Sequence, residues 1–248
     1  MSFLPIPRRL RPLQIAESPV NPHESRATGI LRPIVFGAND GLVSNLALVM
    51  GVAGATSQPG VIVLAGIAGL LAGAFSMGVG EYVSVQSQQE LLAFQTAFQR
   101  RQLIETPDQE RRILEDTYRA RGFTEEEAAH FVERVFADPE HAISVLLHEE
   151  VGLDARSIGS PWQAAIGSFL AFTLGALVPL IPFLLYSGGT AFVGSLTASL
   201  LALALLGYGI SRLTRRSALY SSVRQVLLGG IAAAVTYAVG AFVGVRAG

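Results

Sequence analysis

Long apolar stretches constrain this chain more than any other feature of its sequence. A membrane-spanning helix needs about 20 mostly apolar residues, and the sequence has five stretches of this kind, near residues 33–56, 60–85, 162–186, 190–211 and 223–245. Inside hydrocarbon every backbone polar group must be paired within the protein, which leaves helices and closed barrels. Because each stretch exceeds 20 residues, we predict an all-α integral membrane protein with five transmembrane helices.

The charged residues are segregated in the same way. They make up 15% of the 248 residues, whereas soluble domains carry about 25%. Of the 19 acidic residues, 15 lie between Glu90 and Asp154, and only Asp40 and Glu81 interrupt the apolar stretches. The chain has no cysteine, which excludes disulfides, iron–sulfur clusters and thiolate metal sites. Most of the chain is therefore expected in lipid and one central segment in water.

These patterns divide the chain into four parts. Residues 1–32 contain five prolines and no apolar core, so we expect an irregular arm. Residues 33–85 form the first two spans, residues 86–160 a helical insert and residues 161–248 the last three spans. Capping patterns at Thr106, Thr124 and Asp138 predict a bundle of about three to four helices in the insert. The second span is predicted to continue as a stalk to about residue 103.

Arginine asymmetry predicts the orientation. The N-terminal arm has five arginines, the insert eight and the loop after the fourth span four, whereas the turns on the opposite side have none. We therefore expect the N-terminus and the insert in the cytoplasm, with the multi-pass chain in a bacterial cell (inner) membrane.

Three polar side chains in the first two spans are candidate site residues. An ionisable residue inside a membrane is costly and usually has a function or a partner, and Asp40 shares a face of small residues with Gly37, Ser44, Ala47 and Gly51. Met77 and Glu81 follow one another at helical spacing in the second span. A carboxylate and a thioether together suit a transition-metal ion. A single methionine such as Met77 is more often a packing residue than a ligand, and Glu81 can lie at the headgroup level.

Three segments closely resemble the vacuolar iron transporter family. They are residues 36–44 (FGANDGLVS), 73–84 (GAFSMGVGEYVS) and 175–183 (GALVPLIPF), and the insert adds Gly152-Leu153-Asp154. The resemblance covers about residues 30 to 246 and indicates a bacterial-type member with a cytoplasmic helical insert. It implies a homodimer that exports Fe²⁺, or related ions such as Mn²⁺, from the cytoplasm in exchange for protons. Asp40 and Met77 match the family's intramembrane metal-path residues.

The insert departs from the family pattern. Gln99 and Gln102 occupy stalk positions where the family has metal-binding glutamates, and Leu146 and Leu147 occupy positions of its methionines. Remaining candidate ligands of the insert are Glu105, Glu110, Glu115, Glu149 and Glu150. His130, His141 and His148 could supply replacements, but nothing in their spacing requires it, and solvated surface histidines are the more common case. Metal capture by the insert is therefore the weakest part of the resemblance.

Two other classes of function can be compared with transport. A membrane enzyme is disfavoured because no histidine lies in a predicted span, so a zinc protease or a Ser–His hydrolase lacks its parts. A non-transporting sensor or scaffold, whose insert binds a partner, is the alternative that the sequence leaves open. We expect no resident cofactor and no nucleic-acid partner; the expected partners are metal ions, protons and lipid.

Overall fold

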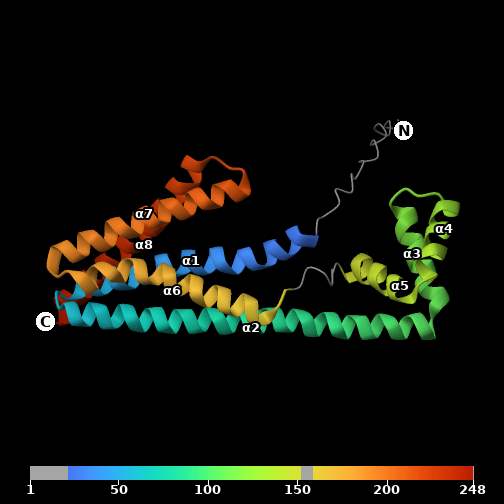
Figure 1. Cartoon of the computed structure of the whole chain (residues 1–248), viewed down its shortest axis with the longest axis horizontal. Coiled ribbons are helices and arrows are strands. Elements are labelled where there is room, and N and C mark those ends of the chain that lie inside the picture. The colour runs from blue at the N-terminus through green and yellow to red at the C-terminus, as the bar shows by residue number, and fades with distance from the viewer. Residues whose placement is uncertain (1–21, 152–158, 248) are drawn as a thin grey trace, which may run out of the picture.

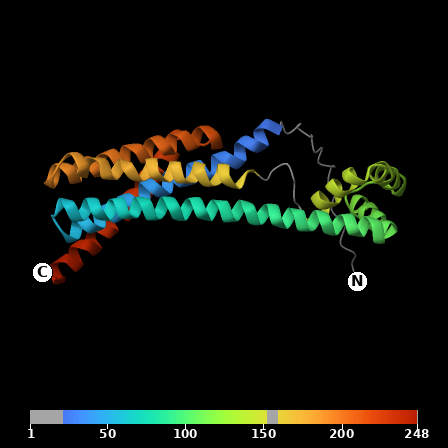
Figure 2. The same ribbon diagram turned by 60° about the horizontal axis from the view of Figure 1, so that its bottom comes forward.

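The computed structural model describes residues 22–151 and 159–247, and this part of the chain is helical (Figure 1). Five of its helices are long and apolar enough to cross a membrane, which confirms the predicted fold class. They are α1 (Pro22–Ala55), α2 (Pro59–Glu105), α6 (Pro161–Leu185), α7 (Gly188–Thr214) and α8 (Ala218–Ala247). They pack along one another, and the end of α8 lies at the end of this layer away from the insert (Figure 2).

Two helices begin earlier than the sequence suggested. α1 begins at Pro22, so residues 22–32 are helical, and the prediction of an irregular arm over this segment was wrong; residues 1–21 lie outside the described part. Proline suits the first helical position because its missing N–H would be unpaired there anyway. α8 begins at Ala218 instead of residue 223, because the turn after α7 is short.

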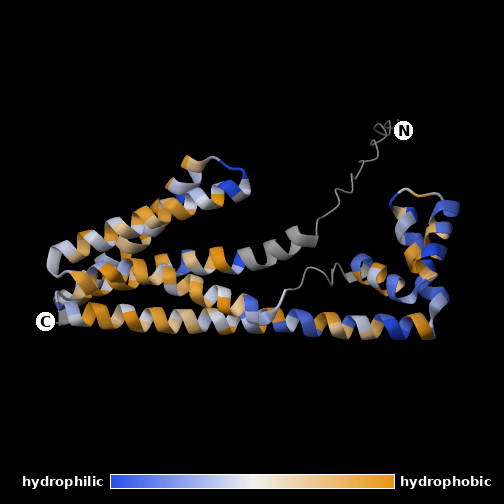
Figure 3. Cartoon of the chain, viewed as in Figure 1, coloured by the Kyte–Doolittle hydropathy of each residue, from blue (hydrophilic) through white to orange (hydrophobic). Residues whose placement is uncertain are grey.

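α2 is both a transmembrane helix and a stalk. Its 47 residues span about 70 Å at 1.5 Å per residue, more than twice the roughly 30 Å of a bilayer core. Tyr82 of α2 stacks on Trp162 in the first turn of α6, with ring centroids 4.9 Å apart. Beyond this contact α2 continues unbroken towards the insert and becomes mixed in hydropathy (Figure 3). The predicted stalk is confirmed.

The insert is a small bundle at the far end of this stalk (Figure 1). It contains α3 (Pro107–Ala120), α4 (Glu125–Phe136) and α5 (Pro139–Leu146), and α5 continues into one π-helical turn, Leu147–Val151. Its core is made by Leu114, Val132, Val135, Ala142 and Leu146. These residues recur at helical spacing in the sequence, so the bundle forms by burying the apolar faces of its helices.

The predicted caps of the insert have mixed outcomes. Thr124 and Glu127 form the reciprocal capping box at the start of α4, and the Asp138 carboxylate accepts a hydrogen bond from the Glu140 N–H at 3.0 Å. Thr106 is the N-cap residue of α3 with Pro107 in its first turn, as predicted, but its side chain makes no capping hydrogen bond, so the capping box expected there was wrong. Its hydroxyl donates back to the carbonyl and side-chain oxygens of Gln102, at 3.2 and 2.9 Å, and so extends the last turn of α2.

α1 is the centre of the membrane layer and contacts α2, α6, α7 and α8. Glycines permit its closest approaches. A Cβ atom added to Gly41 would overlap the Phe172 carbonyl oxygen of α6, and one added to Gly175 would overlap the Ala38 carbonyl oxygen of α1. Towards its C-terminal end, α1 meets α8 in the same way, because a Cβ on Gly240 would overlap the Gly51 carbonyl. Small residues at helix crossings are the usual means by which membrane helices gain packing energy.

We predict that Gly41→Ala destabilises the protein by about 1–3 kcal/mol, because the methyl group must push two backbones apart. Gly209→Ala is the matched control. No atom lies within 4 Å of a Cβ built there, and alanine is favoured over glycine inside a helix by about 1 kcal/mol. Unfolding in mixed detergent micelles, followed by circular dichroism, measures both. Equal stability of the two variants would contradict the close crossing.

Candidate functional site

Asp40 lies on the one face of α1 that the rest of the described chain leaves largely uncovered. Gly37 and Gly41 turn towards α6, whereas Phe36 and Ser44, which flank Asp40 on the opposite side, are exposed and Asp40 itself is half-buried. Among the described residues no side chain forms an ion pair or hydrogen bond with its carboxylate. The carboxylate is therefore available to a ligand that arrives from outside this packed layer.

Met77 occupies a different environment at a similar depth. Asn45 and Leu48 of α1 lie against Gly69 of α2, and counting along the two antiparallel helices at about 1.5 Å per residue places Met77 within about one turn of Asp40 in depth. The Met77 side chain packs in the α2–α6 cluster, which includes Phe169 and Phe172. Its thioether thus contributes to packing, and its role as a metal ligand stays a prediction.

Glu81 lies one residue before Tyr82, the residue that stacks on Trp162 where α6 begins. It is half-buried. Tyrosine and tryptophan concentrate at the membrane–water interface. The position of Glu81 therefore fits the headgroup-level alternative, in which the carboxylate sits at the entrance to the membrane layer.

Two polar residues that no sequence motif singles out form hydrogen bonds with α6, the proline-containing helix beside Asp40. Pro179 and Pro182 lie inside α6 and remove backbone donors from its hydrogen-bond ladder. The Asn45 side-chain amide donates to the Ala176 carbonyl oxygen at 2.7 Å, and the Ser195 hydroxyl donates to the Pro179 carbonyl oxygen at 2.6 Å.

Each accepting carbonyl lies three residues before a proline. The helix bonds that Pro179 and Pro182 cannot donate are those to the carbonyls of residues 175 and 178. The two side-chain bonds therefore do not replace the lost ones; they connect α1 and α7 to the proline segment of α6 one residue further along.

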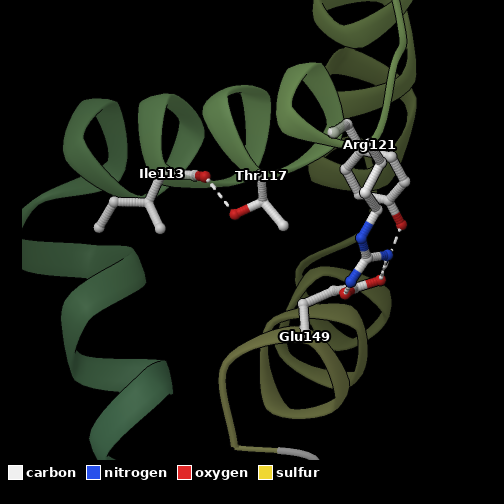
Figure 4. A network of polar contacts seen from close by, with 5 residues as sticks. Ile113, Thr117, Arg121 and Glu149 are labelled. Carbon is white, nitrogen blue, oxygen red and sulfur yellow. Dashed lines mark hydrogen bonds and ion pairs between the residues drawn. The ribbon is translucent and has the colours of Figure 1, made fainter. Parts of the chain in front are cut away.

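In the insert, Glu149 is engaged by an arginine (Figure 4). Arg121 forms an ion pair with its carboxylate, and the Tyr118 hydroxyl donates to the same group at 3.0 Å. Burial raises the pKa of Glu149, but the hydrogen bonds from Arg121 and Tyr118 outweigh it and hold the pKa below its ordinary value. A metal ion would have to displace this arginine.

The other candidate carboxylates of the insert do not gather at one point. Glu105 is exposed at the end of α2, Glu110 is buried on α3 and Glu115 is half-buried; the side chain of Glu150 lies outside the described part. Within the described residues, no three His, Cys, Asp or Glu side chains come close enough to hold a metal ion. The single chain therefore presents no assembled metal centre in its insert, and the ligand roles of these residues stay predictions.

The departures from the family pattern have packing roles. Leu146 and Leu147 are buried in the insert at 0% and 4% exposure. Gln99 is likewise buried on the stalk. Leu146 belongs to the apolar core of the insert. A methionine at such a position could both pack in the core and bind a metal ion, whereas a leucine can only pack.

Two of the insert's histidines line one groove. His130 and His141 border a shallow cavity of about 510 Å³ together with Glu127 and Arg134. Glu127 is held by hydrogen bonds from the backbone and side chain of Thr124, which lower its pKa, and the Arg134 guanidinium repels a cation. The groove therefore does not favour metal binding, and His148 is exposed on the π-helical turn.

Comparison with known proteins gives a consistent result over nearly the whole chain. The model of the VIT family matches residues 31–241. Vacuolar iron transporter 1 of Eucalyptus grandis is 30% identical over 209 residues, which cover 84% of each chain. Vacuolar iron transporter 1 of Tulipa gesneriana is 29% identical over 92% of this chain and 94% of its own. Vacuolar iron transporter homolog 3 of Arabidopsis thaliana is 32% identical over 84% of this chain and 80% of its own.

The matched segment runs from the start of the first span into the last, so it includes Asp40, Met77, the stalk and the kinked α6. The family's members are transporters and not enzymes. The chain belongs to the VIT family and is a multi-pass integral membrane transporter.

Proposed function

We propose that this protein exports divalent transition-metal ions, Fe²⁺ and also Mn²⁺, from the cytoplasm in exchange for protons. The observation that carries the proposal is the Asp40 carboxylate, which lies in a membrane span without an ion-pair partner among the described residues. Membership of the VIT family and the similarity to vacuolar iron transporters support iron as the cargo. Met77 would add a sulfur donor, which softer ions such as Fe²⁺ prefer over Mg²⁺.

Proton coupling has a simple physical basis at Asp40. A carboxylate must lose its proton before it binds a metal ion, and an unpaired negative charge inside the membrane is costly. The low-energy states therefore carry either a proton or a metal ion on this group. When the two occupants exclude each other, a proton gradient can drive the metal in the opposite direction.

We expect a second copy of the chain to pack against the face of α1 that contains Asp40. Small residues on that face, such as Ala47, permit the close approach of another helix. The stalk has an uncovered apolar stripe as well, because Leu91, Phe94 and Phe98 are 48%, 66% and 45% exposed at helical spacing. Pairing of two copies along α1 and α2 would bury both features and place two Asp40 carboxylates on one path.

Orientation follows from the arginine distribution, with the N-terminus and the insert in the cytoplasm. The insert would then meet ions before they reach Glu81 and the membrane path. A bacterial inner membrane is the proposed location.

We expect Asp40→Asn to reduce Fe²⁺ flux to that of protein-free liposomes while leaving the fold intact. Asparagine keeps the shape of the side chain but carries no negative charge and no titratable proton. Proteoliposomes that contain an Fe²⁺-sensitive dye measure the flux under an imposed proton gradient. Glu90→Gln, which neutralises an exposed carboxylate on the stalk, is the matched control and should transport normally. Flux like the wild type in Asp40→Asn would remove this residue from the mechanism.

Met77→Leu should lower Fe²⁺ flux by about tenfold, equivalent to about 1.4 kcal/mol of lost ion affinity. Leucine conserves the volume, so stability should change by less than about 1.5 kcal/mol. Met50→Leu tests the packing contribution, since Met50 is fully buried in the cluster with Leu46 and Val49, away from the proposed path. If both variants lose flux in proportion to lost stability, Met77 is a packing residue and no ligand.

The insert should bind metal weakly, with a dissociation constant of about 100 μM or above, which corresponds to about −5.5 kcal/mol or weaker. The reason is that Gln99 and Gln102 provide no charge and Glu149 is paired with Arg121. Calorimetry with Fe²⁺ on the full-length Asp40→Asn protein isolates this binding from the membrane path. Gln99→Glu combined with Gln102→Glu should tighten it. Low-micromolar binding of more than one ion per chain would contradict the expectation.

A further inference from the structure

The corner between α7 and α8 concentrates positive charge at the edge of the membrane layer. Arg212 lies in the last turn of α7, Arg215 and Arg216 form the connecting turn, and Arg224 lies in the second turn of α8. All four are exposed. The corner lies at about the same height along the molecule as the beginning of α6, and it is the hydrophilic end of this helix pair (Figure 3).

Among the described residues, no carboxylate forms an ion pair with any of these four arginines. The sequence contains no aspartate or glutamate after Asp154, so α6, α7 and α8 carry none. In the part of the chain that the structure describes, the ion pairs are made by Arg100, Arg119 and Arg121 of the stalk and insert. The corner therefore presents four positive charges that an external anion must balance.

Aromatic contacts hold two of these side chains at the interface. The Arg212 guanidinium lies 6.0 Å from the ring centre of Tyr208 and donates to its hydroxyl oxygen at 3.3 Å. The Arg224 guanidinium lies 5.8 Å from the ring centre of Tyr220. Tyrosines of this kind occupy the headgroup region of a bilayer. The guanidinium groups are thus positioned where lipid phosphates lie.

The backbone of the turn between α7 and α8 has an unusual conformation. Arg215 has a φ of +53°, in the left-handed region that non-glycine residues seldom adopt. This conformation ends α7 and lets α8 begin at Ala218, only three residues later. The unpaired N–H groups of the first turn of α8 add a partial positive charge beside the arginines.

The surroundings of the corner suit a lipid. Leu219 and Val223 are 75% and 45% exposed next to the arginines, and they would contact acyl chains while guanidinium groups contact phosphate. Only 11% of the apolar window of α8 is buried against the rest of the chain, compared with 50% for α6. A soluble anion would use the charge but would leave this apolar surface uncovered.

We propose that the α7–α8 corner binds the headgroups of anionic phospholipids. Planar guanidinium groups form paired hydrogen bonds with phosphate oxygens, and the net negative charge of such lipids supplies the missing counter-charge. Zwitterionic lipids carry a phosphate too, but their ammonium group is repelled by the cluster. The corner therefore discriminates between the two lipid classes, and it does so independently of metal transport.

A tryptophan reporter at the corner tests this proposal in the full-length protein. Trp162 is the only tryptophan, so Leu219→Trp in a Trp162→Phe background reports on the corner alone. Quenching by brominated phosphatidylglycerol and by brominated phosphatidylcholine gives the relative affinity of the two lipids. Each arginine near a lipid surface contributes a factor of about five, so we expect at least an approximately fivefold preference for the anionic lipid.

Changing Arg215 and Arg216 to glutamine together removes two of the four charges of the corner and should lower the preference several-fold. The control changes Arg101 and Arg112 to glutamine, which removes the same charge from exposed positions in the stalk and insert, and should leave the preference unchanged. High salt provides a second measurement on the unaltered corner, where the preference should decline because exposed charges are screened. Equal quenching by both lipids in the unaltered corner, or a preference that the Arg215 and Arg216 changes do not lower, would overturn the proposal.

Discussion

The close crossing of α1 with α6 is the contact on which the rest of the membrane layer depends. Backbone meets backbone where Gly41 faces the Phe172 carbonyl and Gly175 faces the Ala38 carbonyl. Lipid provides no hydrophobic force that would drive one apolar helix against another, so packing at such crossings carries much of the association energy. Because α1 also meets α8 through Gly51 and Gly240, one helix organises the spans on both sides of it.

This arrangement has a consequence for Asp40. Because the glycines of α1 pack against α6 and α8, one face of α1 is left largely uncovered by the described chain. That face contains the Asp40 carboxylate. The same crossing brings Asn45 to the Ala176 carbonyl, so the helix that presents Asp40 is also bonded to the proline-containing helix beside it.

The sequence predicted the elements whose signals are local. Apolar length defined the five spans, the absence of a breaker after residue 85 predicted the continuous stalk, and the Thr124–Glu127 pattern predicted a real capping box. The irregular arm was wrong over residues 22–32 because the high proline content was taken to exclude a helix, although Pro22 sits at a position that helices tolerate. Thr106 is the N-cap residue of α3, but its capping bond is missing because its hydroxyl has a competing acceptor in Gln102.

Contacts between distant segments could not be predicted in this way. Asn45 and Ala176 are 131 residues apart, and no sequence pattern near either residue predicts their contact. The pairing of Arg121 with Glu149 is similar, and it changes the interpretation of a candidate metal ligand. For the site, the sequence identified the unusual carboxylate of Asp40, but only the structure showed that its face of α1 is uncovered.

Metal flux by the unaltered protein tests the account most directly. Purified protein is reconstituted into liposomes with an Fe²⁺-sensitive dye and a pH-sensitive dye inside, and Fe²⁺ is added outside. We predict that an acidic lumen accelerates Fe²⁺ entry and that the lumen becomes more alkaline as Fe²⁺ enters. Fe²⁺ entry no faster than in protein-free liposomes would contradict transport, and entry without proton movement would contradict the exchange mechanism.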